Sequence, residues 1–236
     1  MNITAIFLRL AEGMSRSVLI FALTLALSLP LGLFVSFGRM SKWAPFACLG
    51  EAKSAVLRKI AGFKPISFIV KVYISIMRGT PLMLQIMVVY FGPWYIFGIK
   101  ISNAYQFSAV IIAFAINYAA YFAEIYRGGI EAMPKGQYEA AEVLGYRKGQ
   151  AFIKIILPQV VKHILPAVTN EVITLVKDTS LAFVIAYAEM FTVAKQIAAK
   201  ESSVMPFVGA AVFYYVFNLI VAVAMEKAEN RLAYYQ

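Results

Sequence analysis

The chain has 236 residues, of which 61 % are apolar and 14 % are charged, with a mean hydropathy of +0.74 and a net charge of +10. Soluble domains carry about a quarter charged residues, so this composition excludes an ordinary soluble protein and favours a membrane protein. The single cysteine, Cys48, excludes an internal disulfide and a cysteine-based metal cage. The single histidine, His163, excludes the usual paired-histidine metal sites. We therefore expect neither an enzyme nor a metal or cofactor site.

Five apolar stretches are long enough to cross a bilayer, which takes about 20 residues of helix. In chain order they are residues 17–37, 80–98, 108–126, 169–188 and 205–225. The first follows an amphipathic lead-in, residues 1–16, and has no small-residue cleavage pattern, so we expect a retained helix and not a signal peptide. The predicted fold class is all-α, a polytopic bundle of five transmembrane helices that forms a single membrane domain over residues 1–236.

Basic residues are unevenly distributed between the connecting segments. Eight lie between the first two spans, six between the third and fourth, and two after the last, whereas five lie in the segments on the other side. Lys and Arg accumulate on the cytoplasmic side of membrane proteins. This predicts an N-terminus outside and a cytoplasmic C-terminus. The long first loop contains a basic stretch, residues 51–61, with the spacing of a surface-lying helix.

Residues 137–158 interrupt the apolar pattern between the third and fourth spans. They contain five charged residues, too many for a hydrocarbon environment. Tyr138, Ala141 and Leu144 recur at three-residue spacing, which predicts one apolar stripe on a short helix. Gly145 then allows a turn. We expect two short helices across the cytosolic face of the bundle, and the alternative is an ordinary interfacial loop helix.

This segment resembles the EAA motif of permease subunits of bacterial ATP-binding-cassette (ABC) importers, which reads EAA, three residues, Gly, nine residues, Ile, one residue, Leu-Pro. The matching residues are Glu139, Ala140, Ala141, Gly145, Ile155, Leu157 and Pro158, with no departure. Residues 78–81, 123–130 and 177–181 are similar to the polar amino acid (histidine/glutamine/glutamate/arginine-type) branch of the family. The similarity covers about residues 15–232.

The resemblance implies a permease subunit that imports polar amino acids across the bacterial inner membrane. Its coupling helix would dock in a cleft of a cytosolic ATPase, with Glu139 pairing with donors there and Leu144 as an apolar anchor. Ala140, Ala141 and Gly145 would permit close contact. The implied partners are two ATPase subunits, a second permease that is a copy or a homologue, and an extracytoplasmic amino acid-binding protein. The chain itself has no phosphate-binding GxxxxGK[ST] sequence, so a separate subunit must hydrolyse ATP.

Polar residues inside the predicted spans are candidates for the substrate path, because ionisable groups are costly in a membrane. These candidates are Asn117, Tyr121, Glu124, Lys177, Asp178, Thr179 and Ser180. An amino acid needs a cation for its carboxylate and an anion for its ammonium, which Lys177 and Asp178 could supply. The alternative is that these two point to different helix faces, and that Glu124 forms an ion pair with Arg127.

Two other functions stay open on the residues alone. A secondary transporter for amino acids, driven by an ion gradient, would need more helices and usually shows internal symmetry. A membrane-embedded enzyme would need a nucleophile and base, a metal cluster or a carboxylate pair in one span. Neither gives a reason for a docking helix.

Overall fold

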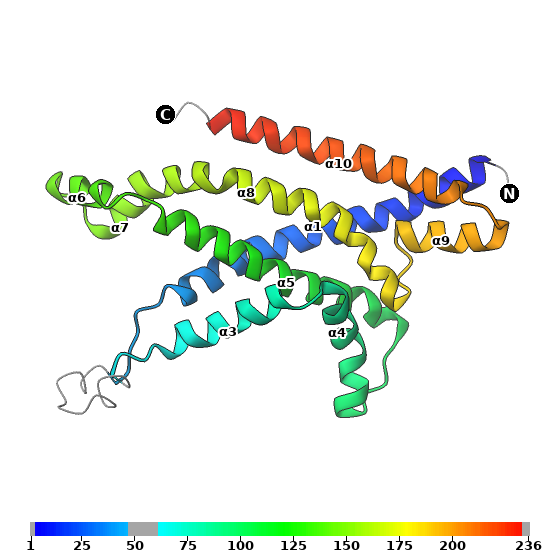
Figure 1. Ribbon diagram of the computed structural model, residues 1–236, viewed down its shortest axis with the longest axis horizontal. Helices are drawn as coiled ribbons and strands as arrows, with labels where there is room; N and C mark the ends of the chain where they lie inside the picture. The colour runs from blue at the N-terminus through cyan, green and yellow to red at the C-terminus, as the bar shows by residue number, and fades with distance from the viewer. Residues whose placement is uncertain (1–2, 47–60, 233–236) are drawn as a thin grey trace.

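The computed structural model describes residues 3–46 and 61–232, and every regular element in these ranges is helical (Figure 1). The long helices are α1 (Ile3–Arg39), α5 (Asn103–Glu131), α8 (Leu157–Asp178) and α10 (Met205–Leu232). The shorter helices are α3 (Pro65–Gly79), α4 (Leu82–Phe97), α6 (Lys135–Val143), α7 (Lys148–Ala151) and α9 (Met190–Glu201). The predicted all-α polytopic bundle is confirmed.

Four stretches are long and apolar enough to cross a membrane, namely α1, α5, residues 148–185 and α10. A fifth crossing exists only if α3 and α4 are taken together, because the two helices are bent by 109°. The span predicted at residues 80–98 is therefore wrong as a straight helix. Thr80 is extended at the bend, with φ −120° and ψ 146°, a conformation favoured before a proline such as Pro81.

Two other predicted boundaries are also corrected. α1 is helical from Ile3, so residues 3–16 are continuous with the span and do not form a separate interfacial segment. The fourth spanning stretch starts near residue 148 and not at 169, because α7, a π-helical turn (Phe152–Ile156) and α8 follow one another directly. The second short helix expected after Gly145 is thus the start of a long membrane helix. The predicted basic helix at 51–61 lies almost wholly outside the described residues.

α1 packs along α5 in the most extensive helix contact of the fold. Ser28, Gly32 and Ser36 recur at four-residue spacing on α1, and both serines are fully buried. A Cβ atom at Gly32 would lie only 2.8 Å from the Cβ of Phe122 on α5. Small residues at such spacing let membrane helices approach closely, so these positions fix α1 against α5.

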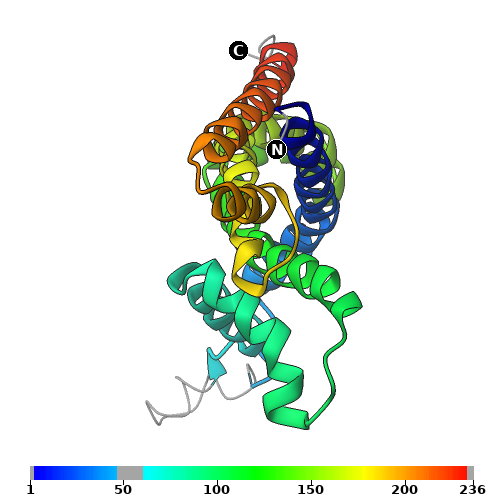
Figure 2. The same ribbon diagram turned by 90° about the vertical axis from the view of Figure 1, so that its right-hand side faces the viewer.

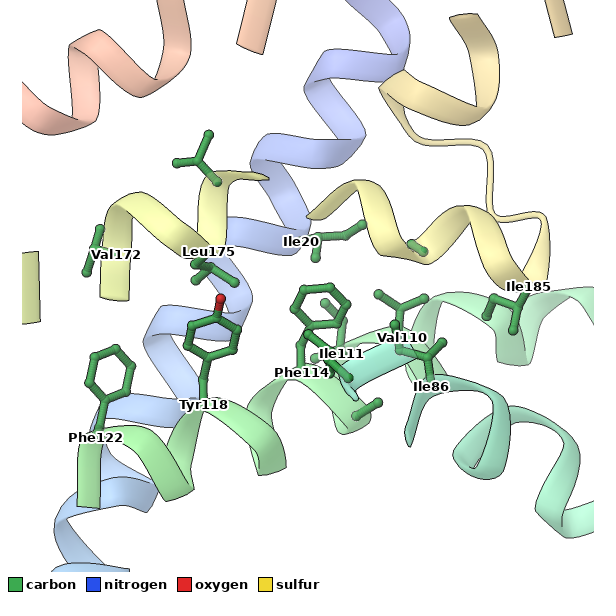
Figure 3. Close-up of a cluster of buried hydrophobic side chains, with 14 of the residues drawn as sticks. Ile20, Ile86, Val110, Ile111, Phe114, Tyr118, Phe122, Val172, Leu175 and Ile185 are labelled. Atoms are coloured by element: carbon green, nitrogen blue, oxygen red, sulfur yellow. The ribbon is translucent and has the colours of Figure 1, made fainter. Parts of the chain in front are cut away.

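α5 is the central helix, since 67 % of its most apolar stretch is buried, compared with 22 % for α1 and 11 % for α10. Phe114, Tyr118 and Phe122 project from it at four-residue spacing into the core (Figure 3). Leu175 of α8 and Ile86 of α4 complete this cluster and are fully buried. The core therefore joins α5 to the bent α3–α4 pair on one side and to α8 on the other.

The bundle has two distinct ends. α6 and α7 lie at one end with the C-terminal end of α10, and the N-terminus lies at the other end near α9 (Figure 1). Seen end-on, α4 projects away from the long helices (Figure 2). The start of α1 and the end of α10 therefore lie at opposite ends of the bundle, as expected if the α3–α4 pair counts as a fifth crossing.

α9 has no counterpart among the predicted elements, and a buried glutamate holds its start in place. Glu189 is 0 % exposed, and its carboxylate accepts hydrogen bonds from the backbone N–H groups of Phe191 and Thr192, both at 2.7 Å. The hydroxyl groups of Thr192 and Tyr214 donate to the same carboxylate, at 2.8 and 3.0 Å. Such N-capping satisfies N–H groups that lack helical partners, and the Tyr214 bond ties α9 to α10.

Candidate functional site

A cavity of about 350 Å³ lies between the α3–α4 bend, α5 and α8. This volume is within the roughly 300–1,000 Å³ range of small-molecule sites. The cavity is lined by Thr80, Pro81, Leu82, Asn117, Tyr118, Tyr121, Glu171, Thr174, Asp178 and Leu181. Its lining is rich in carboxylate, amide and hydroxyl groups, which suits a polar ligand.

Two carboxylates dominate the charge of this cavity. Glu171 and Asp178 are seven residues apart on α8, close to two helical turns, so they share one face of the helix. The hydroxyl of Tyr118 donates to Oδ2 of Asp178 at 2.8 Å. Among the described residues, no lysine or arginine lines the cavity. The site is therefore acidic and suited to a cation.

The wall of the cavity at the α3–α4 bend is held by two amide side chains. Nε2 of Gln85 donates to the carbonyls of Met77 and Thr80 and to Oγ1 of Thr80, at 3.0, 3.1 and 2.8 Å. Nδ2 of Asn117 donates to Oε1 of Gln85 and to the Met77 carbonyl, both at 3.0 Å. The bend frees carbonyls at the end of α3, and in a membrane these need partners within the protein. Asn117 therefore lines the cavity and also fixes its shape.

Three of the predicted substrate-path residues meet in this cavity: Asn117, Tyr121 and Asp178. Glu124 does not line it. Its carboxylate accepts from Nη2 of Arg127 at 2.6 Å, and Arg39 and Arg78 approach the same carboxylate at 3.9 and 4.0 Å. The ion pair that was the alternative for Glu124 is thus the arrangement present.

Lys177 and Asp178 are separated, although they are adjacent in sequence. Lys177 and Ser180 line a different cavity of about 360 Å³, together with Phe191, Phe207, Ala210, Ala211 and Tyr214. Thr179 is fully buried and its hydroxyl donates to the Val176 carbonyl at 2.8 Å. Consecutive helical residues point about 100° apart, which places Lys177 away from the acidic cavity. The expected pairing of Lys177 and Asp178 around one ligand is therefore corrected.

Tyr118, which lies between the candidates Asn117 and Tyr121 on the same span, also lines the cavity. Three polar lining residues were missing from the predicted set: Thr80, Glu171 and Thr174. Glu171 carried a usable signal, because it is an ionisable residue inside the predicted fourth span and lies seven residues before Asp178. The two threonines carry neutral side chains, and only the packing of the helices reveals their place.

The segment resembling the coupling helix forms α6 and the turn after it. Glu139, Ala140, Leu144 and Gly145 are exposed, and Leu144 retains 73 % of its accessible surface. Ala141 is only 1 % exposed, since α6 packs on α7 and the π-helical turn. Ala141 thus packs against its own chain, and the close contact with a partner that the resemblance implied for it stays a prediction. Its small side chain lets α6 lie close to its own chain.

Gly145 ends α6 through a left-handed turn. Its φ is +77°, a region that glycine enters without the steric cost of a Cβ. The N–H groups of Gly145 and Tyr146 donate to the carbonyls of Glu142 and Ala141, at 2.9 and 3.0 Å. This is the Schellman pattern of helix termination. Gly145 is therefore required by the backbone, and it leaves Leu144 projecting at the tip of the turn.

Comparison with known proteins gives the family. Residues 59–234 match the family described as "Binding-protein-dependent transport system inner membrane component". The chain belongs to this family. Among its relatives, the arginine transport system permease protein ArtQ of Bacillus subtilis (strain 168) is 41 % identical over 177 residues, which cover 75 % of this chain and 80 % of ArtQ. The probable amino-acid ABC transporter permease protein YckA of the same organism is 36 % identical over 225 residues, which cover 95 % of this chain and 89 % of YckA.

Solved structures agree with this assignment. A crystal structure of an amino acid ABC transporter with histidines has 31 % identity and a TM-score of 0.78, over 97 % of this chain and 94 % of that chain. An inward-facing MetNI methionine ABC transporter shares the fold, with 15 % identity and a TM-score of 0.65, over 98 % of this chain and 99 % of that chain. The chain is therefore a multi-pass permease subunit of an ABC importer and not an enzyme.

Proposed function

We propose that this permease subunit imports polar amino acids with cationic side chains across the bacterial inner membrane. The observation that carries the proposal is the pair of carboxylates, Glu171 and Asp178, in one cavity that no described lysine or arginine lines. Carboxylates inside a membrane protein are costly unless a cation or strong donors neutralise them. A guanidinium or ammonium side chain supplies that positive charge, and an anionic side chain would be repelled.

Two of the similar proteins support the same substrate class, whereas others, at 33 % and 35 % identity, are named as L-cystine and putative glutamine permeases. The arginine transport system permease ArtQ is 41 % identical to this chain. The solved amino acid transporter described with histidines covers nearly the whole chain. Both names point to amino acids whose side chains carry nitrogen bases, which matches an acidic cavity.

α6 is proposed as the coupling helix that docks on a cytosolic ATPase. Val143 and Leu144 are 89 % and 73 % exposed at the polar end of the bundle, beside the exposed carboxylate of Glu139. Exposed apolar side chains ringed by charged ones are typical of protein interfaces. Leu144 would enter a cleft of the ATPase and Glu139 would accept from its donors, so that closure of the ATPase moves α6 and the helices behind it.

The proposed orientation in the membrane rests on the distribution of basic residues between the two ends of the bundle. The C-terminal end of α1, the start of α3 and α6 lie at the end of the bundle where α10 ends (Figure 1). Arg39 ends α1 and Lys64 precedes α3, so this end is rich in basic residues. The positive-inside rule makes it the cytoplasmic end, with the N-terminus outside. A second permease, which is a copy or a homologue, two ATPase subunits and an extracytoplasmic binding protein complete the proposed importer.

The test is uptake by proteoliposomes that contain the complex, its ATPase and its binding protein. We expect uptake of radiolabelled L-arginine that requires ATP and is much slower for L-glutamate. Uptake driven by an ion gradient without ATP would instead support the secondary transporter. ATP-driven uptake of glutamate but not of arginine would overturn the substrate class and leave the importer assignment standing.

A further inference from the structure

An amino acid carries an α-carboxylate, and the acidic cavity offers it no obvious partner. The two charged side chains among its lining residues, Glu171 and Asp178, would repel this carboxylate. Lys177, the nearest basic residue in sequence, lines the other cavity. If amino acids bind here, a cation next to the lining must balance the carboxylate.

Arg78 is the basic residue that lies next to the lining of this cavity. It lies in the last turn of α3, two residues before Thr80, which lines the cavity. Its guanidinium carbon is 5.3 Å from the centre of the Tyr121 ring, and Tyr121 is also a lining residue. This cation–π contact holds the guanidinium at the edge of the cavity. The charge of Arg78 also acts on Glu171.

The guanidinium of Arg78 is only weakly engaged by protein groups. Its contact with Glu124, at 4.0 Å, is at the limit of an ion pair, while Arg127 occupies the same carboxylate with bonds of 2.6 and 3.2 Å. Within the described residues, Arg78 donates no hydrogen bond, and its side chain is 46 % exposed. Arginine has five N–H donors in a planar fork that fits a carboxylate. Arg78 therefore has both the charge and the free donors for a ligand.

We propose that Arg78 binds the α-carboxylate of the transported amino acid at the edge of the cavity. The proposal rests on the proposed function, in which this cavity binds an amino acid with a cationic side chain. The substrate then lies between Arg78 at its carboxylate and Glu171 and Asp178 at its positive groups. Arg78 selects amino acids over simple amines.

The test compares L-arginine with L-argininamide, which keeps the side chain and the α-ammonium but lacks the carboxylate. Binding is measured on the purified complex in lipid nanodiscs without the binding protein. A charge-assisted, two-pronged pair is worth at least about 10-fold in affinity, so the wild type should prefer arginine by about that factor. Arg78→Gln should reduce the ratio to about 1–2-fold, and Arg78→Lys, which keeps the charge but not the fork, should give an intermediate ratio.

Arg39→Gln is the matched control. Arg39 approaches the same Glu124 carboxylate at 3.9 Å, but it bonds to Ser67 and does not contact Tyr121. This variant should keep the wild-type ratio. An unchanged ratio in Arg78→Gln, or in Arg78→Lys if the first variant does not fold, overturns the proposal, and so does an equal loss in Arg39→Gln. If the wild type binds neither compound, the proposed substrate class fails and this inference fails with it.

Discussion

Glu171 and Asp178 face the same cavity from two positions seven residues apart on α8. Asp178 is also held by the Tyr118 hydroxyl of α5, whereas the Thr174 hydroxyl between the two acids is turned back to the Asn170 carbonyl. Both acids are therefore available as acceptors along one side of the cavity. This arrangement leads to predictions that separate binding, coupling and stability.

Replacing Asp178 by Asn should weaken binding of L-arginine by about 10-fold or more, because a hydrogen bond to a charged group contributes about 1.5–3 kcal/mol. Binding is measured on the purified complex, and assembly with the ATPase should be unchanged. Lys177→Gln is the matched control, since Lys177 is adjacent to Asp178 in sequence but lines a different cavity. Equal losses in the two variants would contradict the separation of these residues.

Replacing Leu144 by Ser should reduce recovery of the ATPase with the permease and lower ATP-driven uptake, while arginine binding to the cavity persists. In this account the Leu144 side chain becomes buried only in the complex. Burial of such an apolar side chain contributes about 1.5–3 kcal/mol to binding, and the serine lacks this contribution. Val204→Ser is the control, because Val204 is similarly exposed, 72 % against 73 %, but lies at the opposite end of the bundle. An intact ATPase complex with Leu144→Ser would show that α6 is not the docking element.

Replacing Gln85 by Leu should lower the melting temperature and weaken arginine binding together. The change removes a donor to the Met77 and Thr80 carbonyls and the Oε1 atom that accepts from Asn117. Asn117 still donates to the Met77 carbonyl, so the cost should be that of about one polar group left unsatisfied, roughly 1–3 kcal/mol. Gln159→Leu removes an amide at the end of the bundle near α6, away from the bend, and should have a smaller effect on both quantities. A normal melting temperature with Gln85→Leu would show that the bend does not depend on this amide.

Glu189 should make stability depend on pH. Burial raises the pKa of its carboxyl above the ordinary value, and hydrogen bonds from Phe191, Thr192 and Tyr214 act in the opposite direction. A raised pKa in the folded state means that the folded protein binds this proton more tightly. The contribution of Glu189 to the free energy of unfolding is thus fully present below its pKa in the unfolded chain, about 4.3. This contribution is lost as pH rises through its pKa in the folded protein.

The comparison uses thermal unfolding of the wild type and Glu189→Gln between about pH 4 and 7. The uncharged variant replaces one of the two carboxylate oxygens, which accept from the Phe191 and Thr192 N–H groups, with an amide donor, so it should melt at a lower temperature at every pH. The difference in melting temperature between Glu189→Gln and the wild type should become smaller as pH rises, because only the wild type then carries a buried charge. A constant difference across this range would exclude titration of Glu189.

The sequence predicted well the features that depend on local composition. Apolar length correctly placed the first, third and last of the five predicted crossings, and the EAA spacing located α6 and its Gly145 turn. The bend between α3 and α4 was missed because the apolar run after Thr80 has the length of a span, and the angle depends on Gln85 and Asn117, which are distant in sequence. The burial of Ala141 and the separation of Lys177 from Asp178 depend likewise on which helices pack against each face.

The central claim is that two carboxylates select a cationic side chain, and L-citrulline tests it directly because it has nearly the shape of L-arginine without the charge. Equilibrium binding of both is measured on the purified complex and on the Glu171→Gln, Asp178→Asn double variant. We predict that the wild type binds arginine at least about 10-fold more tightly than citrulline, and that the double variant binds the two alike. Equal affinities in the wild type, or an undiminished preference for arginine in the double variant, would contradict the account.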